Sequence, residues 1–498
     1  MSTLRGVDPI TAQSRLQGDA PALIFREQVV SWAQLESRAN RVARALRERG
    51  VSADDRIAVC LRNSVEFFEL VAGAGRLGAT VVPVSFRFKR DEVEYMVTDS
   101  RARVVVAEPA NRPEFVNLPD AIFRGEEYEA WIAAEPEDPL GDGFGEGLAT
   151  LRYYTSGTTG RPKAVVRQDS AEGRAVREKM TVARLGPVAG SGEVHLLAGV
   201  AYHTAPGAYA TAALSMGHTV VITDHFDAEE ALALVACHRV TWTQMAPIHL
   251  VRLVALPDDV LARYDLSSVK RVLHAGAPCP VDVKWKALAL FPKGSVYEYY
   301  AATEGVGTEC PEELWRRKPG TVGLPLPGVS IHVLDGDGVA LASGEVGQVY
   351  IRNGSRFEYE GAPEKTADTW RDDMFSVGDM GYLDEEGCLF LTDRTSHMII
   401  SGGANIYPAE VENVLYAHSA VGDVAVIGVP DDEFGEQVKA IVERRSPVTG
   451  AELIEFCRSR LSHYKCPRSV DFVDVLPRDP NGKVRKREPY WQDRAARI

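Results

Sequence analysis

A dense run of glycine, hydroxyl and basic residues occupies positions 154–163, with the sequence YTSGTTGRPK. Glycines let backbone N–H groups approach an anion, hydroxyls donate further hydrogen bonds, and a lysine adds a point charge. The run does not contain the G-x-x-x-x-G-K-[ST] pattern of a Walker A loop. We therefore predict a phosphate-binding loop of another type, formed by Thr155, Ser156, Gly157, Thr158, Thr159, Gly160 and Lys163.

Two further segments carry residues suited to a nucleotide and its metal ion. Thr303 and Glu304 come shortly after the strand-like sequence SVYEYY, so the hydroxyl can meet a phosphate oxygen and the carboxylate a Mg²⁺ ion. Asp379 lies in the segment GDMGY, and a carboxylate can accept hydrogen bonds from both hydroxyls of a ribose. The residue types therefore favour a site for a magnesium nucleotide.

These motifs, in this order, resemble those of the adenylate-forming superfamily, which comprises acyl-CoA synthetases, peptide-synthetase adenylation domains and luciferases. The resemblance covers nearly the whole chain and implies that the loop holds the β- and γ-phosphates of ATP. It also implies that Thr303 contacts phosphate, that Glu304 binds Mg²⁺ and that Tyr300 lies against the adenine. Asp379 would bind the ribose, supported by Arg394. The other nucleotide contacts that it implies are Gly276, Ala277, Pro278, Tyr299 and Ala301.

The resemblance also assigns residues near the acyl pocket and the C-terminus. Gly402 and Gly403, in SGGANIYP, resemble residues that line the tunnel for the pantetheine arm of CoA. Lys483, in PNGKVRK, resembles the family's catalytic lysine, and a cation there would bridge the incoming carboxylate and the α-phosphate. His203 matches a histidine at the mouth of the acyl pocket. We interpret it as a gate rather than a base, with a buried core histidine as the alternative.

The periodicity of apolar residues indicates an α/β fold. Residues 32–49 place apolar side chains on one helical face, and residues 56–61 read as a buried strand. Further helices and apolar strands alternate along the first part of the chain, which favours a largely parallel sheet. Residues 320–382 change to short strands with glycine-rich turns, typical of a β-rich subdomain, and a helix is expected over 452–464.

We expect two domains. The large N-terminal domain, 1–394, would bind ATP and the acid and would consist of layered α/β sheets plus the β-rich subdomain. The small α/β C-terminal domain, 395–498, would be mobile and would carry Lys483. In the family this domain rotates between the two half-reactions, which is a hinge motion.

Two positions depart from the family's pattern. Ser396 occupies the hinge position that is usually Lys or Asp, which leaves the efficiency of the CoA half-reaction open. Ala301 replaces the glycine that usually follows the adenine-contacting tyrosine. The added methyl group should narrow the acyl pocket and favour a compact or aromatic acid over a long straight chain.

The composition limits which binding partners and which cellular compartment we expect. A formal net charge of −14 argues against a nucleic-acid partner or a membrane surface, because both would be repelled. No run approaches the roughly 18 apolar residues of a membrane span. The N-terminal sequence lacks the apolar core of a signal peptide. The 7 cysteines are scattered without a C-x-x-C pair, which favours reduced thiols. We expect a soluble, cytoplasmic enzyme.

The resemblance implies a reaction in two steps. ATP, with Mg²⁺ as cofactor, activates a small carboxylic acid or analogous anion as its adenylate and releases pyrophosphate. CoA then takes the acyl group, which yields an acyl-CoA and AMP. A carrier-protein thiol or an amine as acceptor, or activation of nitrite, is the alternative. A nucleotide-binding sensor is disfavoured because Glu304 and Lys483 are both present.

Overall fold

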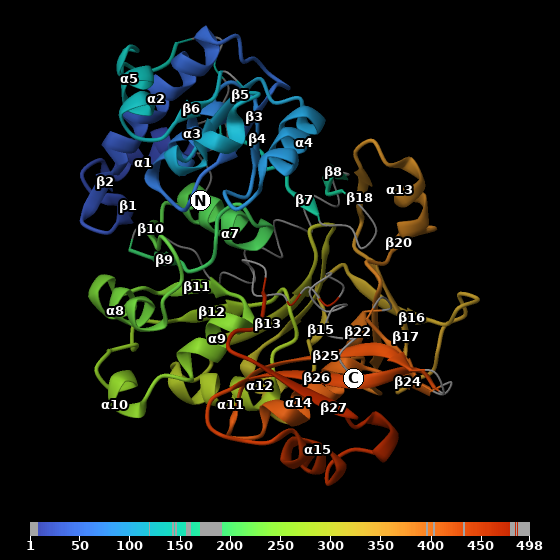
Figure 1. The fold of residues 1–498 in the computed structure, drawn as a ribbon. Helices are drawn as coiled ribbons and strands as arrows, with labels where there is room; N and C mark the ends of the chain where they lie inside the picture. Colours follow the sequence, from blue (N-terminus) through green and yellow to red (C-terminus); the bar gives the residue numbers. More distant parts are fainter. Residues whose placement is uncertain are drawn as a thin grey trace.

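The computed structural model describes residues 8–118, 120–141, 144, 147–155, 161–169, 192–394, 397–401, 404–431, 434–478, 484 and 486 of the 498-residue chain. Across these ranges no helix is both long and apolar enough to cross a membrane. Helices and sheets form successive layers, with the N-terminal elements at the top of Figure 1 and the C-terminal elements at the lower right. The predicted α/β class is confirmed.

A four-stranded sheet of parallel strands, in the order β4-β3-β5-β6, forms the N-terminal end. Its strands are β3 (Arg56–Cys60), β4 (Thr80–Pro83), β5 (Val104–Ala107) and β6 (Ile122–Phe123). One face packs on α4 (Arg90–Ser100), and the other packs on α2 (Trp32–Glu48) and α3 (Val65–Gly75). Two short helices complete this end of the molecule, α1 (Pro9–Gln17) and α5 (Glu126–Ala133).

Helix α2 shows how the sequence directs this packing. Leu35, Ala39, Val42 and Leu46 recur at helical spacing and are all fully buried against the core. Ser31 caps the first turn, because Gln34 N donates to its Oγ (3.2 Å) while its own N–H donates to the Gln34 side chain (2.8 Å). The predicted helix over residues 32–49 is confirmed to within one residue.

A nine-stranded sheet lies at the centre of the molecule. Its strand order is β15-β14-β13-β12-β11-β9-β10-β1-β2, parallel from β13 to β1 and antiparallel at both edges. These strands are β1 (Pro21–Phe25), β2 (Gln28–Ser31), β9 (Val194–Leu197), β10 (Thr219–Ile222), β11 (Trp242–Met245), β12 (Arg271–His274), β13 (Val296–Ala301), β14 (Val306–Cys310) and β15 (Leu324–Pro325).

Helices cover both faces of the nine-stranded sheet. One face meets α7 (Thr204–Ser215) and the core that continues to the four-stranded sheet. The opposite face is covered by α8 (Ala228–His238), α9 (Pro247–Leu253), α10 (Asp258–Leu261), α11 (Val281–Leu290) and α12 (Glu312–Arg317). Strands buried on both faces explain the near-continuous apolar runs in the sequence.

Two antiparallel sheets form the β-rich part. The six-stranded sheet contains β16 (Ser330–Leu334), β17 (Gly347–Arg352), β19 (Trp370–Arg371), β20 (Met374–Phe375), β21 (Asp379–Leu383) and β22 (Leu389–Arg394). The three-stranded sheet joins β7 (Tyr154–Thr155), β8 (Lys163–Asp169) and β18 (Ser355–Tyr359), and α13 (Pro363–Thr369) follows β18. Figure 1 shows this small sheet beside α13, between the four-stranded sheet and the six-stranded sheet.

The C-terminal part has its own sheet and its own core. The sheet contains β23 (Ile399–Ser401), β24 (Ala404–Ile406), β25 (Val421–Asp431), β26 (Gly435–Arg444) and β27 (Ser469–Val473), packed with α14 (Pro408–Tyr416) and α15 (Gly450–Arg458). The helix expected over 452–464 is wrong at its C-terminal end. Arg460 N and Leu461 N both donate to the Cys457 carbonyl, so the chain turns after α15 and forms a 3₁₀ turn only at His463–Lys465. The domain boundary itself stays a prediction, since residues 395 and 396 lie outside the described ranges.

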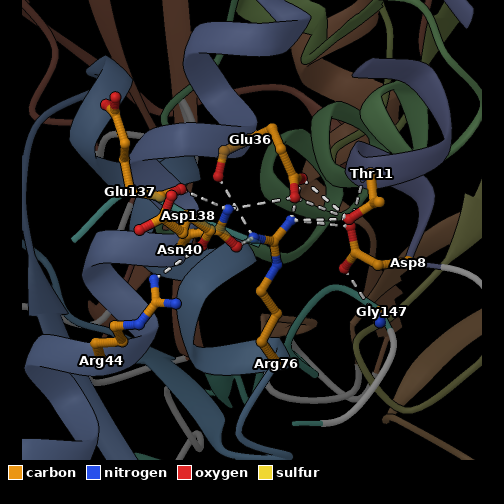
Figure 2. A network of polar contacts seen from close by, with 9 residues as sticks. All are labelled: Asp8, Thr11, Glu36, Asn40, Arg44, Arg76, Glu137, Asp138 and Gly147. Atoms are coloured by element: carbon orange, nitrogen blue, oxygen red, sulfur yellow. Dashed lines mark hydrogen bonds and ion pairs between the residues drawn. The ribbon is translucent and has the colours of Figure 1, made fainter. Parts of the chain in front are cut away.

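One buried guanidinium joins the N-terminal helices. The Arg76 side chain, 3% exposed, ion-pairs with Asp8 (3.1 Å) and Glu36 and donates to the Asn40 side chain (Figure 2). Asp8 also caps α1 by accepting from Thr11 N (2.9 Å) and accepts from Gly147 N (3.3 Å). The network therefore ties α1 and α2 to the end of α3, and the segment at residue 147 to both.

We predict that Arg76→Met lowers the free energy of unfolding by about 3 kcal/mol, because it leaves the buried carboxylate of Asp8 and the partly buried carboxylate of Glu36 without their cation. Urea denaturation followed by tryptophan fluorescence measures this free energy, since α2 contains a buried tryptophan, Trp32, about one turn before Glu36. Arg26→Met is the matched control. Its ion pair with Asp224 (3.0 Å) is on the surface, with Arg26 67% exposed, and its loss should cost less than about 1 kcal/mol. Equal effects of the two changes would contradict the assignment.

Candidate active site

Several of the predicted site residues that the structure describes lie at one edge of the nine-stranded sheet. Because β12 and β13 are neighbouring parallel strands, the segments that leave their carboxyl ends lie side by side. The segment after β12 contains Gly276, Ala277 and Pro278, and the segment after β13 contains Thr303 and Glu304. Gly276 has φ +95°, a conformation that suits glycine, and a Cβ there would meet no described atom within 4 Å. This glycine is therefore required by its backbone conformation and leaves the surface of the turn open.

Tyr300 and Asp379 meet although 79 residues separate them. Tyr300 Oη donates a 2.7 Å hydrogen bond to Asp379 Oδ2, and both residues are buried. Gly307 packs against the Tyr300 ring, since a Cβ there would lie 3.1 Å from Tyr300 Cδ1. In the ladder of β21 and β22, Asp379 pairs with Arg394, whose backbone alone is described. The structure thus brings together two residues for which the sequence analysis predicted separate roles, Tyr300 at the adenine and Asp379 at the ribose.

Tyr299 and Ala301 flank Tyr300 in β13. Tyr299 packs against Tyr209 of α7 with ring centroids 5.9 Å apart, and Ala301 contacts the same small apolar cluster. This cluster lies on the face of the sheet that α7 covers. Within β13, Tyr300 therefore contacts Asp379, whereas Tyr299 and Ala301 lie on the side of α7.

Glu304 is held by a residue that sequence reasoning did not single out. Tyr359 Oη donates to Glu304 Oε1 (2.7 Å), and the two residues are 5% and 6% exposed. Gly305 allows the close packing behind this carboxylate, because a Cβ there would lie 2.6 Å from Asn353 Nδ2 and from Phe375 Cζ. A buried carboxylate oriented by a tyrosine is a suitable ligand for a hard divalent cation.

Thr303 is also held by two residues that the sequence analysis missed. Its Oγ1 lies 2.9 Å from Thr204 Oγ1, and its carbonyl oxygen accepts from Arg167 Nη2 (2.5 Å). Thr204 opens α7, and Arg167 belongs to β8, so three elements converge on this threonine. The pattern FEYEGAPEKT around Tyr359 was visible in the sequence, but no local signal marked Thr204 or Arg167 as neighbours of Thr303.

The two ends of the predicted phosphate loop lie opposite each other. Thr155 and Lys163 are partners in the antiparallel pair of β7 and β8, and the residues between them, Ser156 to Gly160, lie outside the described ranges. Thr155 Oγ1 is buried and makes no hydrogen bond with the described part of the chain, which fits a hydroxyl aimed at a phosphate oxygen. Lys163 Nζ lies 3.4 Å from Asp99 Oδ1, while Tyr154 Oη donates to Asp99 Oδ2 (2.9 Å). The Tyr95 side chain and Asp99 raise the pKa of Lys163, so the lysine stays charged.

His203 is the residue before α7, and its ring lies 4.5 Å from the ring of Tyr202. Its neighbour Thr204 contacts Thr303, so the histidine lies near the site, and its role as a gate stays a prediction. Gly402, Gly403 and Lys483 lie outside the described residues, and their assignments also stay predictions.

Comparison with known proteins identifies the family of this chain. A model of the family described as AMP-binding enzyme matches residues 10–358, and one described as AMP-binding enzyme C-terminal domain matches residues 410–483. The fatty acid–[acyl-carrier-protein] ligase ScoC of Streptomyces coeruleorubidus is 31% identical, across 96% of this chain and 95% of its own. A feruloyl-CoA synthase of an Amycolatopsis species is 34% identical, across 96% of each chain.

A solved structure of similar fold contains the expected nucleotide. O-succinylbenzoate coenzyme A synthetase from Bacillus subtilis, in complex with ATP and a magnesium ion, has a TM-score of 0.81 and 26% identity to this chain, and the likeness covers 97% of this chain and 98% of that one. With the family models spanning most of the sequence, the resemblance noted from the motifs is confirmed: this chain belongs to the AMP-binding enzymes of the adenylate-forming superfamily.

Proposed function

We propose that this protein is an acid–thiol ligase that activates a carboxylic acid with ATP as acyl-AMP, releases pyrophosphate, and transfers the acyl group to CoA. The observation that carries the proposal is that β13 and the segment after it make two contacts four residues apart. Tyr300 reaches Asp379 on the nucleoside side, and four residues later Glu304 provides a buried carboxylate on the phosphate side. One segment thereby supplies groups for both ends of a magnesium nucleotide.

The residues have complementary roles in the first half-reaction. Tyr300 packs against the adenine, and Asp379 accepts hydrogen bonds from the ribose hydroxyls. The phosphate loop, Thr303 and Lys163 hold the β- and γ-phosphates, and Glu304 is the ligand for Mg²⁺. When bound there, Mg²⁺ would supply neutralisation of the charge on the departing pyrophosphate. Lys483 bridges the acid and the α-phosphate, so catalysis consists of positioning and electrostatic stabilisation.

In the second half-reaction the thiol of CoA attacks the acyl-AMP carbonyl carbon, the bond to the phosphate oxygen breaks, and AMP leaves. We propose that the domain 395–498 rotates between the two steps about the Ser396 region, presenting Lys483 first and the Gly402–Gly403 segment second. A carrier-protein thiol is the specific alternative acceptor, since a relative at 31% identity is named as a ligase for an acyl-carrier protein.

Pyrophosphate release by the purified protein tests the proposal directly. The panel contains aliphatic, aryl and steroid acids and nitrite, each with ATP and Mg²⁺, with and without CoA, and products are identified by mass spectrometry. We expect an acid to trigger pyrophosphate release and CoA to convert the adenylate to a thioester. Adenylate formation with indifference to CoA would instead identify another acceptor, and the absence of acid-dependent pyrophosphate release would overturn the proposal.

We predict that Lys483→Ala separates the two half-reactions. Acid-dependent pyrophosphate release should fall by about a hundredfold or more, because an electrostatic group at the reacting centre is lost. Thioester formation from supplied acyl-AMP and CoA should remain close to that of the unaltered protein. Equal losses in both half-reactions would contradict the assignment of Lys483 to the first step alone.

We also predict that Tyr359→Phe raises the Mg²⁺ concentration needed for half-maximal pyrophosphate release about tenfold, because Glu304 loses the donor that orients it. Tyr264→Phe is the matched control. It likewise removes a tyrosine donor from a carboxylate, Glu229 (3.0 Å), and this partly buried pair joins α8 to the turn after α10. A Mg²⁺ dependence that stays unchanged in Tyr359→Phe would exclude Glu304 as the metal ligand or Tyr359 as its support.

A further inference from the structure

Lys365, to which the sequence analysis assigned no role, lies beside Tyr359, the residue that holds Glu304. Lys365 belongs to α13, is partly buried, and places its Nζ 3.9 Å from the centroid of the Tyr359 ring, whose hydroxyl holds Glu304. The position of this helix is fixed by its neighbour Thr366. Tyr359 N donates to Thr366 Oγ1 (2.9 Å), and that hydroxyl donates to the Ala362 carbonyl (3.0 Å). The lysine is therefore presented by a short helix anchored on the end of β18.

The register of β8 and β18 brings α13 to the phosphate loop. Tyr359 pairs with Val165, only two residues after Lys163, and Glu360 N donates to the Ala164 carbonyl (3.0 Å). Figure 1 shows α13 beside β8 and β18. The start of the lysine-bearing helix is thus adjacent to the strand that leaves the loop.

Two arginines anchor the connection between β18 and α13 from the side of the four-stranded sheet. Arg56 Nη2 ion-pairs with Glu360 Oε1 (2.6 Å), its Nη1 donates to Oε2 (3.0 Å), and Arg152 Nη1 lies 3.5 Å from the same Oε2. A bidentate pair with a guanidinium restricts orientation as well as position. The N-terminal end of α13 is therefore fixed both by the Thr366 contact to β18 and by the two arginines that bind Glu360.

The charges around this lysine are incompletely balanced. Lys163 has Asp99 as its counterion, whereas Lys365 makes no ion pair within 4 Å in the ranges that the structure describes. Burial lowers the pKa of Lys365, the Glu304 carboxylate opposes this shift, and the charge of Lys163 adds to it. The two lysines and the carboxylate therefore interact electrostatically across one small region. An anion bound beside this partly buried ammonium would offset its desolvation.

We propose that Lys365 binds the β- and γ-phosphates of ATP, and the pyrophosphate formed from them, as a second cation beside Lys163. The inference rests on the proposed ATP site and adds a residue to its phosphate end. The nucleoside end is formed by Tyr300 and Asp379, so Lys365 should act on a triphosphate and not on a nucleoside monophosphate. Its contact with the Tyr359 ring holds the ammonium in place before the nucleotide arrives.

Calorimetric titration of the full-length protein with two probes tests this inference without knowledge of the acid. The probes are the Mg²⁺ complex of α,β-methylene-ATP and AMP, which lacks the β- and γ-phosphates. Lys365→Met should raise the dissociation constant of the ATP analogue about tenfold to a hundredfold, as expected for a lost charge-assisted phosphate contact. The dissociation constant for AMP should not change. Lys365→Arg, which keeps the charge, should recover most of the affinity.

Lys286→Met removes an exposed lysine of α11 and should alter neither affinity. If Lys365→Met weakened the binding of AMP and of the ATP analogue equally, the lysine would have only a structural role. If it weakened the binding of neither probe, the phosphate contact would be excluded. Failure of the unaltered protein to bind either probe would overturn the proposed function itself, which is a different result.

Discussion

The parallel pairing of β12 with β13 is the constraint on which the site depends. Parallel neighbours end at the same edge of a sheet, so the segments after them must share space, and here those segments carry Gly276 and Thr303–Glu304. The six-stranded sheet then has to dock at this edge. The hydrogen bond from Tyr300 to Asp379 joins the two sheets, and Gly305 and Gly307 permit the close approach that it requires. The candidate site is therefore a junction of sheets, as is common for ligand sites in α/β proteins.

Local charge decides what this junction can hold. The chain carries a net charge of −14, yet the phosphate side of the site presents two lysines, Lys163 and Lys365, near the carboxylate of Glu304. Fixed cations in a partly buried setting are screened less than surface charges, so they dominate the field felt by a bound anion. Net charge is informative about large partners such as nucleic acids and says little about a small polyanion in a protected site.

Prediction from the sequence was most informative where the residues of interest lie close together in one short segment. Tyr300, Thr303, Glu304 and Asp379 stand in compact motifs, and helix α2 follows from a clear apolar periodicity ended by Gly50. Residues whose roles depend on strand register or on packing between distant elements could not be found this way. Tyr359 reaches Glu304 across 55 residues, and Thr204 reaches Thr303 across 99. The over-long helix at 452–464 has a similar cause, because helical periodicity continued past Ser459, where backbone hydrogen bonding ends α15.

The two ends of the site differ in a way that suits a reaction with two products. Tyr300 and Asp379 are both buried and hydrogen-bonded to each other, which would make a rigid surface for the proposed nucleoside. Lys163 and Lys365 are only partly buried and act mainly through charge. Once the bond between the α- and β-phosphates breaks, the proposed pyrophosphate would be held by the phosphate-side groups, with these long cationic side chains among them, while the adenylate would keep its buried partners. Because the two products depend on separate groups, pyrophosphate can leave first while the activated acid stays in place for its acceptor.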